Sequence, residues 1–61
     1  EITLVVQVNG KIRARIAAEP GIDEERAYAL AMAEKNVKDF LGDKSIRMRV
    51  YVPDKLLNLV V

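Results

Sequence analysis

The Asn9-Gly10 pair, flanked by runs of β-branched residues, is the feature that most restricts the fold of this chain. The run before it reads Val5-Val6-Gln7-Val8, and the run after it reads Lys11-Ile12-Arg13-Ala14-Arg15-Ile16. Asn-Gly between two such runs is the strongest short-range signal for a β-hairpin. The sequence therefore predicts two antiparallel strands, Ile2–Val8 and Lys11–Ala18.

The length of the hairpin loop decides which side chains share a face. A two-residue loop would pair Val8 with Lys11 and mix core and charge on one face. A three-residue loop, Val8 to Gly10 with Gly10 left-handed in a G1 bulge, pairs Gln7 with Lys11 instead and separates the two. Since a slip of one residue reverses every side chain, we predict the three-residue loop.

The middle of the chain predicts two helices. Glu19-Pro20-Gly21 ends the strand pattern. Asp23 is then a suitable N-cap for a helix over Glu24–Glu34, whose core-spaced residues are Ala27, Leu30 and Ala31. A second short helix over Val37–Leu41 ends at Gly42, and Phe40 is expected to anchor it in the core.

The last part of the chain predicts two more strands. Over Ser45–Val52 the pattern alternates, which places Ile46, Met48, Val50 and Val52 inward and Arg47, Arg49 and Tyr51 outward. Pro53-Asp54 is typical of a turn. Over Leu56–Val61, Leu57, Leu59 and Val61 face the core, so that Leu56, Asn58 and Val60 face out.

The element order β-β-α-α-β-β predicts an α+β fold, with a sheet of about four strands and both helices packed on one face. The 61 residues make one domain, 1–61. The order of the strands in the sheet stays open. Because the first residue is Glu1 rather than Met, we expect the domain to be part of a longer protein.

The net charge of +1 conceals a strong segregation. Residues 1–18 carry three cations and one acid, residues 19–43 three cations and seven acids, and residues 44–61 four cations and one acid. If the helices cover one face of the sheet, the other face is basic, and such a face suits a polyanion. Solubilising lysines and arginines are the alternative reading. The apolar residues expected among the cations, Val5, Tyr51, Leu56 and Val60, favour an RNA surface.

Composition excludes several other functions. The chain has no Cys and no His, so it lacks the usual nucleophile–base pairs and zinc ligands, and we expect neither catalysis nor a cofactor or metal in this domain. No apolar run approaches the ~20 residues that span a bilayer, so no membrane partner is expected. The absence of Cys fits a reducing, cytoplasmic location.

Three separated motifs carry a family resemblance: Gln7–Arg13 (QVNGKIR), Asn36–Leu41 (NVKDFL) and Tyr51–Val61 (YVPDKLLNLVV). In this order and spacing they resemble the C-terminal domain of bacterial leucyl-tRNA synthetase over essentially the whole chain. The family pattern has Gly where this chain has Asp54, and Asp is tolerated in a turn with unusual φ.

The resemblance implies an appended domain of a class I synthetase, joined to the remainder of that chain by a flexible linker. It implies contact with the elbow of tRNA-Leu, where the D and TΨC loops meet, whereas ATP would be used by the parent enzyme's catalytic domain. Cations would then hold phosphates and an outward apolar group would pack on the bases. The expected RNA-binding residues are Lys11, Arg13, Arg15, Arg47, Arg49, Tyr51, Lys55 and Leu56.

A protein-interaction module of β-grasp type is the alternative, since a hairpin, a helix and further strands also describe that class. A modifier of this class would need a tail ending in Gly-Gly, whereas the last residues here are Leu59-Val60-Val61.

Overall fold

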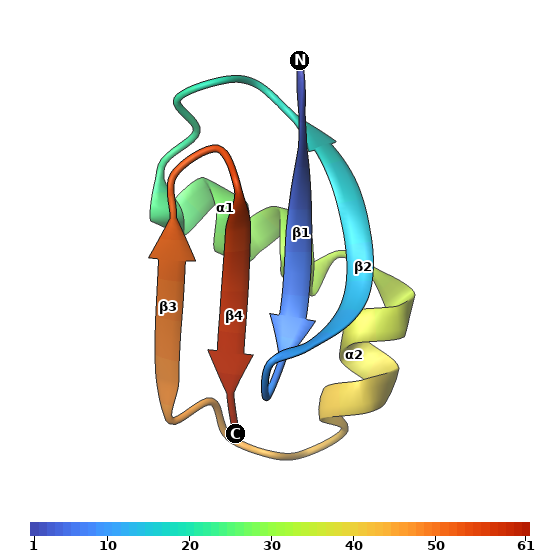
Figure 1. Cartoon of the computed structure of the whole chain (residues 1–61). Helices are drawn as coiled ribbons and strands as arrows, with labels where there is room; N and C mark the ends of the chain where they lie inside the picture. The colour runs from blue at the N-terminus through green and yellow to red at the C-terminus, as the bar shows by residue number, and fades with distance from the viewer.

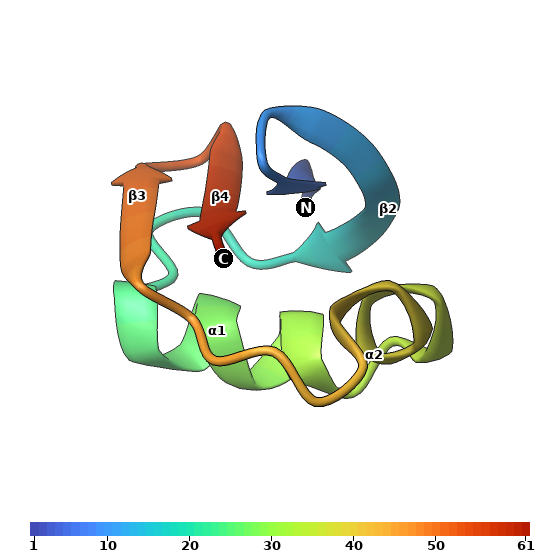
Figure 2. The same ribbon diagram turned by 90° about the horizontal axis from the view of Figure 1, so that it is seen from below.

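A mixed four-stranded sheet with two helices on one of its faces forms the architecture, as the computed structural model of residues 1–61 shows (Figures 1 and 2). The predicted α+β class and element order are confirmed. The elements are β1 (Ile2–Val8), β2 (Lys11–Ala18), α1 (Glu24–Met32), α2 (Lys35–Leu41), β3 (Met48–Val52) and β4 (Leu56–Val60).

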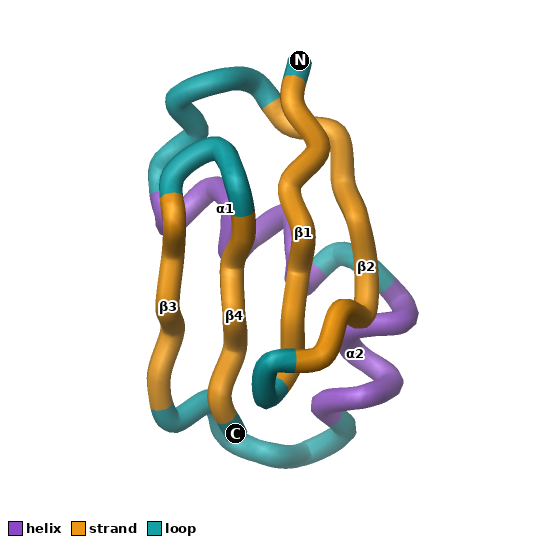
Figure 3. The backbone as a smooth tube through the Cα atoms, viewed as in Figure 1, coloured by secondary structure: helices purple, strands orange, loops and turns teal.

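The strand order is β2-β1-β4-β3, so the first and last strands lie side by side in the middle of the sheet. β1 and β4 are parallel, and each forms an antiparallel hairpin with its sequence neighbour. The tube in Figure 3 shows both hairpins side by side, with the helical segment crossing from β2 to β3 behind them. The crossing covers only one face, so the other face of the sheet stays open to solvent (Figure 2).

The core lies between the sheet and the helices. Its fully buried sheet residues are Leu4, Val6, Val8, Leu57 and Leu59, which come from the two central strands. Alternation along β1 and β4 placed these residues correctly. From the helices, Ala27, Ala31, Val37 and Leu41 complete the core. The small alanines let α1 approach the sheet closely.

The hairpin loop differs from the prediction. Val8 pairs with Lys11, and both Asn9 (φ 53°) and Gly10 (φ 83°) are left-handed, which is a two-residue turn of type I′. The extra residue of the bulge lies instead at Arg13, because Gln7 pairs with Ile12 and Val6 with Ala14. The bulge resets the alternation, so that Ala14 and Ile16 face the core and Arg15 faces the open side, whereas Lys11 and Arg13 both stay on the helix side.

The turn is also tied to the end of β4, which explains why the polar pair Asn9 and Asn58 lies there. The Asn9 side chain accepts a hydrogen bond from the Val61 N–H at 3.0 Å, and the Gly10 N–H donates to Asn58 Oδ1 at 3.0 Å. These bonds span the parallel pair and fix the tip of the first hairpin against the last strand.

The helices are capped as expected but differ in length. The Asp23 side chain accepts from the Arg26 N–H at 2.8 Å, and Gly42 ends α2 with φ 59°. The first helix ends at Met32 rather than Glu34, and the second begins at Lys35 rather than Val37. Leu30 and Phe40 were predicted in the core but are 39% and 41% exposed, since each lies at the edge of its helix's buried stripe.

The inward and outward residues of β3 are reversed relative to the prediction. Met48, Val50 and Val52 lie on the open face and are exposed, whereas Arg49 and Tyr51 are half-buried on the helix side. The strand is at the sheet edge, over α1, where the core gives way to solvent. Long side chains with polar ends suit that position better than valines, because they pack with their stems and reach water or a partner with their tips.

Candidate nucleic-acid interface

Arg49 and Tyr51 are engaged by the fold. The Arg49 guanidinium donates to Glu25 Oε1 at 2.9 Å, lies 3.4 Å from Glu24 Oε2 and stacks 4.6 Å from the Tyr28 ring centroid. The hydrogen bond to Glu25 raises the pKa of Arg49 above its usual value, and the two carboxylates add to this effect. The Tyr51 hydroxyl donates to the Ile22 carbonyl. Both residues were expected on the outward basic face, and this placement is wrong.

Lys11 and Arg13 also lie on the helix side, which corrects their predicted position on the open face, because Lys11 pairs with the buried Val8 and Arg13 follows two residues later. The bulge displaces Arg13 from the position opposite Val6, which Ala14 takes, and the Arg13 guanidinium carbon lies 3.6 Å from the Phe40 ring centroid on α2. The side chain is half-buried, and its Nε has no hydrogen-bond partner in the chain. Arg13 therefore joins β2 to α2 and leaves its other donors at the rim of the sheet.

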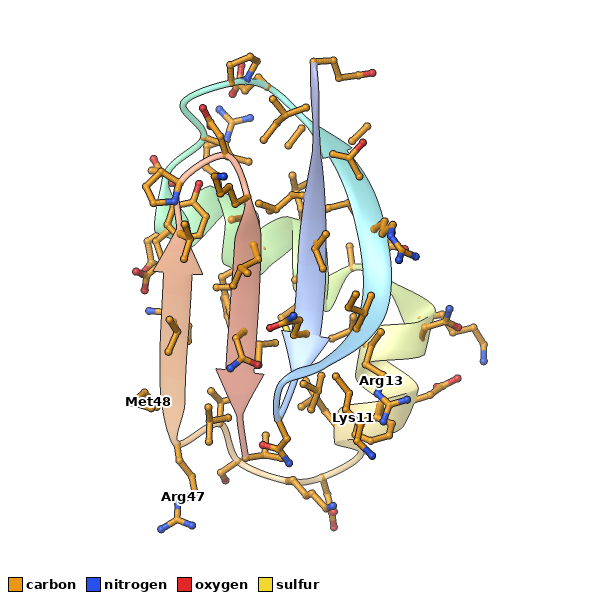
Figure 4. The ribbon with its side chains drawn as sticks, viewed as in Figure 1. Lys11, Arg13, Arg47 and Met48 are labelled. Atoms are coloured by element: carbon orange, nitrogen blue, oxygen red, sulfur yellow. The ribbon has the colours of Figure 1, made fainter.

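Three of the predicted RNA-binding cations, Lys11, Arg13 and Arg47, lie at one end of the molecule. Figure 4 shows Lys11 and Arg13 beside α2, and Arg47 and Met48 at the start of β3, all at the end that carries the Asn9-Gly10 turn. The pairing register agrees, since Lys11, Val8, Leu59 and Arg49 form one row across the four strands. We call the set Lys11, Arg13, Arg47 and Met48 the hairpin-tip end.

None of the three cations of the hairpin-tip end is used in an ion pair, because the four ion pairs of the structure involve only Arg26, Lys35 and Arg49. Lys11 and Arg47 are exposed. Strands are ~4.8 Å apart, so a β2 residue and a β3 residue stand roughly 14 Å from one another. One phosphate cannot contact both, and the two sides of this end suit separate phosphates of one extended backbone.

Arg15 and Leu56 lie on the open face of the sheet, as predicted. Arg15 pairs with Val5, Val5 with Leu56 and Leu56 with Val52, so that these residues form one row across the sheet. In the next row Ile12, Gln7, Asn58 and Val50 follow each other. The open face is therefore largely apolar, with amide groups at its centre and cations at its margins.

Lys55 is separated from the other predicted site residues. It lies in the turn between β3 and β4, at the end opposite the hairpin-tip end (Figure 1). The loops there are rich in acids, Glu19, Asp23 and Asp54, and Asp54 accepts a hydrogen bond from the Gly21 N–H at 2.8 Å. The sequence predicted a basic face backed by acidic helices. The structure instead separates the charges from end to end.

Sequence reasoning missed Met48, which is 55% exposed at the hairpin-tip end, because an apolar residue in an alternating strand was assigned to the core. The signal that could have placed β3 correctly was the acidic pair Glu24 and Glu25. Arg49 can form ion pairs with these two acids only when it faces the helix, and such pairs favour that orientation.

Two classes of site are not formed by these residues. No group of three or more acidic, His or Cys side chains is placed to hold a metal ion. None of the helices is both long and apolar enough to cross a membrane. A surface of separate cations beside exposed apolar groups can bind a polyanion that also offers a flat apolar surface.

Comparison with known proteins identifies the family of this chain. No family model matches the chain. Leucine–tRNA ligase of Rubrobacter xylanophilus is 50% identical over 60 residues, which are 98% of this chain. The enzymes of Syntrophus aciditrophicus and Halorhodospira halophila are 48% and 47% identical over 61 and 60 residues. The chain belongs to the leucine–tRNA ligase family.

The resemblance inferred from the three motifs is thereby confirmed, and the chain spans about 7% of the length of these leucine–tRNA ligases. Among solved structures, a ternary complex of Agrobacterium radiobacter K84 agnB2 LeuRS with tRNA and LeuAMS contains a similar domain. Its TM-score is 0.88 at 32% identity, over 97% of this chain and 8% of that one.

Proposed function

We propose that this domain is the C-terminal appended domain of a leucine–tRNA ligase and binds the elbow of tRNA-Leu, in support of aminoacylation. The observation that carries the proposal is the hairpin-tip end, where three cations free of ion pairs lie beside exposed apolar side chains. A relative of known structure was solved with tRNA. Leucine activation with ATP belongs, in this proposal, to the rest of a cytoplasmic enzyme, joined to the domain by a flexible linker.

The division of labour follows from the geometry. Lys11 and Arg13 bind phosphates on the α2 side, and Arg47 binds them at the start of β3. Arg15 adds charge at the margin of the open face. For the bases, the sequence favoured Tyr51 or Leu56, but the Tyr51 hydroxyl is bonded to the Ile22 carbonyl. An apolar group of the open face, Leu56 or Met48, is then the residue that packs on the exposed base pair of the elbow.

Charge variants at the two ends of the domain test this proposal. Neutralising Lys11 and Arg47 together (Lys11→Gln/Arg47→Gln) removes two phosphate contacts, so the affinity for labelled tRNA-Leu at low salt should fall about tenfold or more. The matched control is Arg26→Gln/Lys55→Gln, which removes the same charge at the opposite end. Equal losses for the two pairs would reduce the interaction to net charge and contradict the proposed surface.

Removing the domain from a full-length ligase separates its role from the chemistry. Aminoacylation should weaken through a higher KM for tRNA, while leucine activation by ATP, measured without tRNA, stays intact. Loss of activation would mean that the domain supports the catalytic domain itself.

One observation, the apolar open face, still favours the alternative function as a protein-interaction module of β-grasp type. A protein partner would be favoured if tRNA left the hairpin-tip end unperturbed.

A further inference from the structure

A hollow of about 380 Å³ lies between β2 and α2 and is lined by Ile12, Arg13, Asn36, Asp39 and Phe40. It opens beside the hairpin-tip end, since Lys11 directly precedes Ile12 in β2. An aromatic ring, a guanidinium, an amide and an aliphatic side chain thus converge on one concave surface. Side chains of these types stack on nucleobases and hydrogen-bond to their edges.

Phe40 is the only phenylalanine of the chain, and it is 41% exposed. Its neighbours at the buried positions of α2, Val37 and Leu41, are almost completely buried. The helix therefore docks without Phe40, and the exposed part of its ring is not needed to close the core. Exposed aromatic rings serve as stacking surfaces for bases in proteins that bind single-stranded nucleic acid.

The bulge decides where on the helix side Arg13 lies. In a regular strand Arg13 would pair with Val6 over the core, whereas the bulge gives that position to Ala14 and leaves Arg13 unpaired, with its guanidinium 3.6 Å from the Phe40 ring centroid. Bulges are frequent at sheet edges and next to functional sites, where they re-aim a side chain. A guanidinium that lies on a ring extends the stacking surface and keeps donors for a phosphate.

The two polar residues of the hollow differ in how they are held. Asp39 is paired with Lys35 at 2.6 Å, which neutralises its charge next to the hollow. The Asn36 amide takes part in none of the side-chain hydrogen bonds of the structure. An amide offers both donors and an acceptor and can bond to the edge of a base.

We propose that this hollow binds a single unstacked RNA base. The base stacks on the exposed part of the Phe40–Arg13 pair, the Asn36 amide bonds to its edge, and Lys11 is close enough to contact its phosphate. The site is distinct from the open face proposed to meet the elbow base pair. It rests on the proposed function in that both ligands are RNA and in that Lys11 and Arg13 take part in both contacts.

The test is titration of the ¹³C,¹⁵N-labelled 61-residue chain with a single-stranded uridine hexamer, whose bases stack weakly on each other. We expect upfield ring-current shifts of the Phe40 ring protons and a shift of the Arg13 Nε–H. Phe40→Leu, which keeps an apolar group but removes the ring, should lower the hexamer affinity about tenfold, in the range of one lost stack. Leu30→Ala on α1 is the control, because Leu30 is exposed to a similar extent, 39%.

Asn36→Ala provides a second variant that leaves the Phe40–Arg13 contact and the core untouched. It should weaken the hexamer severalfold without changing the melting temperature. If the hexamer shifts miss Phe40, or if Phe40→Leu and Asn36→Ala bind like the control, the contact between Arg13 and Phe40 only holds α2 and the inference is wrong. If the hexamer changes the chemical shifts of Phe40 but the chain does not bind tRNA-Leu, this site is supported and the elbow proposal is refuted.

Discussion

Arg47 and Arg49 are two positions apart, yet their surroundings assign them opposite tasks. Arg47 is exposed at the hairpin-tip end, and its N–H donates to the Val60 carbonyl at 2.7 Å, which fixes the backbone just before β3. Arg49 bridges β3 to α1 through Glu24, Glu25 and Tyr28. Alternation in a strand predicted the same face for both residues. The acids of α1 hold Arg49 on the helix side, whereas Arg47 lies in the segment before β3 and stays exposed.

Arg49→Gln should destabilise the fold and leave RNA binding nearly unchanged, whereas Arg47→Gln should do the reverse. The melting temperature and the tRNA-Leu affinity of both variants measure this. Because the pKa of Arg49 is raised, its stabilising effect is fully present below the pKa of an unfolded-state arginine and is lost only as the pH rises through the raised folded-state pKa. Deprotonation of Arg49 should therefore contribute no change in stability between pH 6 and 9. A tRNA defect in folded Arg49→Gln as large as that of Arg47→Gln would contradict these assignments.

Asp54 holds a left-handed conformation, φ 61°, and its carboxylate accepts the Gly21 N–H. Asp54→Ala removes the hydrogen bond and keeps a β-carbon where only Asn, Asp and Gly are well tolerated, so unfolding should become easier by about 1–2 kcal/mol. Asp54→Gly, the residue of the family pattern, relieves the backbone and should cost less. Urea denaturation of both variants decides the order, and an Ala variant as stable as the Gly variant would argue against it.

The elements show which sequence signals decided the fold. Alternation was reliable on β1 and β4, because both are central and one face of each is fully buried by the helices. On the edge strand β3 it failed, since Val50 and Val52 look like core residues and only the position of α1 shows that Tyr51 lies inward. The hairpin was predicted correctly, but its bulge was misplaced because the contact of Arg13 with Phe40 is tertiary.

The same difference between local sequence patterns and tertiary contacts decides which site residues could be predicted. Arg15, Arg47 and Leu56 could be predicted as outward residues from local pattern alone. Lys11 could not, because the two-residue turn pairs it with Val8 and places it on the helix side. The opposite orientation of Arg13, Arg49 and Tyr51 could not, because each is held by a partner at least 24 positions away: Phe40, Glu25 and Ile22. Long-range contacts of this kind produce no periodic pattern of residues in the sequence.

A substitution pair on β3 tests the reversed faces directly. Val50→Lys places a charge on the open face and should change the free energy of unfolding by no more than about 0.5 kcal/mol. Tyr51→Ala removes packing and the hydrogen bond to Ile22 and should cost roughly 2–3 kcal/mol. Chemical denaturation of the two variants gives both values. A severely destabilised Val50→Lys with a tolerated Tyr51→Ala would restore the orientation first predicted from the sequence.

At the scale of the whole molecule, charge is arranged along the axis rather than across the sheet. The hairpin-tip end carries Lys11, Arg13 and Arg47, and the loops at the other end carry Glu19, Asp23 and Asp54. Such a field orients a small domain as it approaches a polyanion, with the basic end leading and the acidic end kept away.

The most direct test of the account is a ¹⁵N shift-mapped titration of the domain with tRNA-Leu at 50 and 200 mM salt. We expect the largest shifts at Lys11, Arg13, Arg47 and Met48, with small ones at Arg49 and Lys55. Three phosphate contacts give a slope of roughly −2 to −3 in log affinity against log salt. Shifts confined to the acidic end, or an affinity that does not change with salt, would contradict the central claim that the hairpin-tip end binds the RNA backbone.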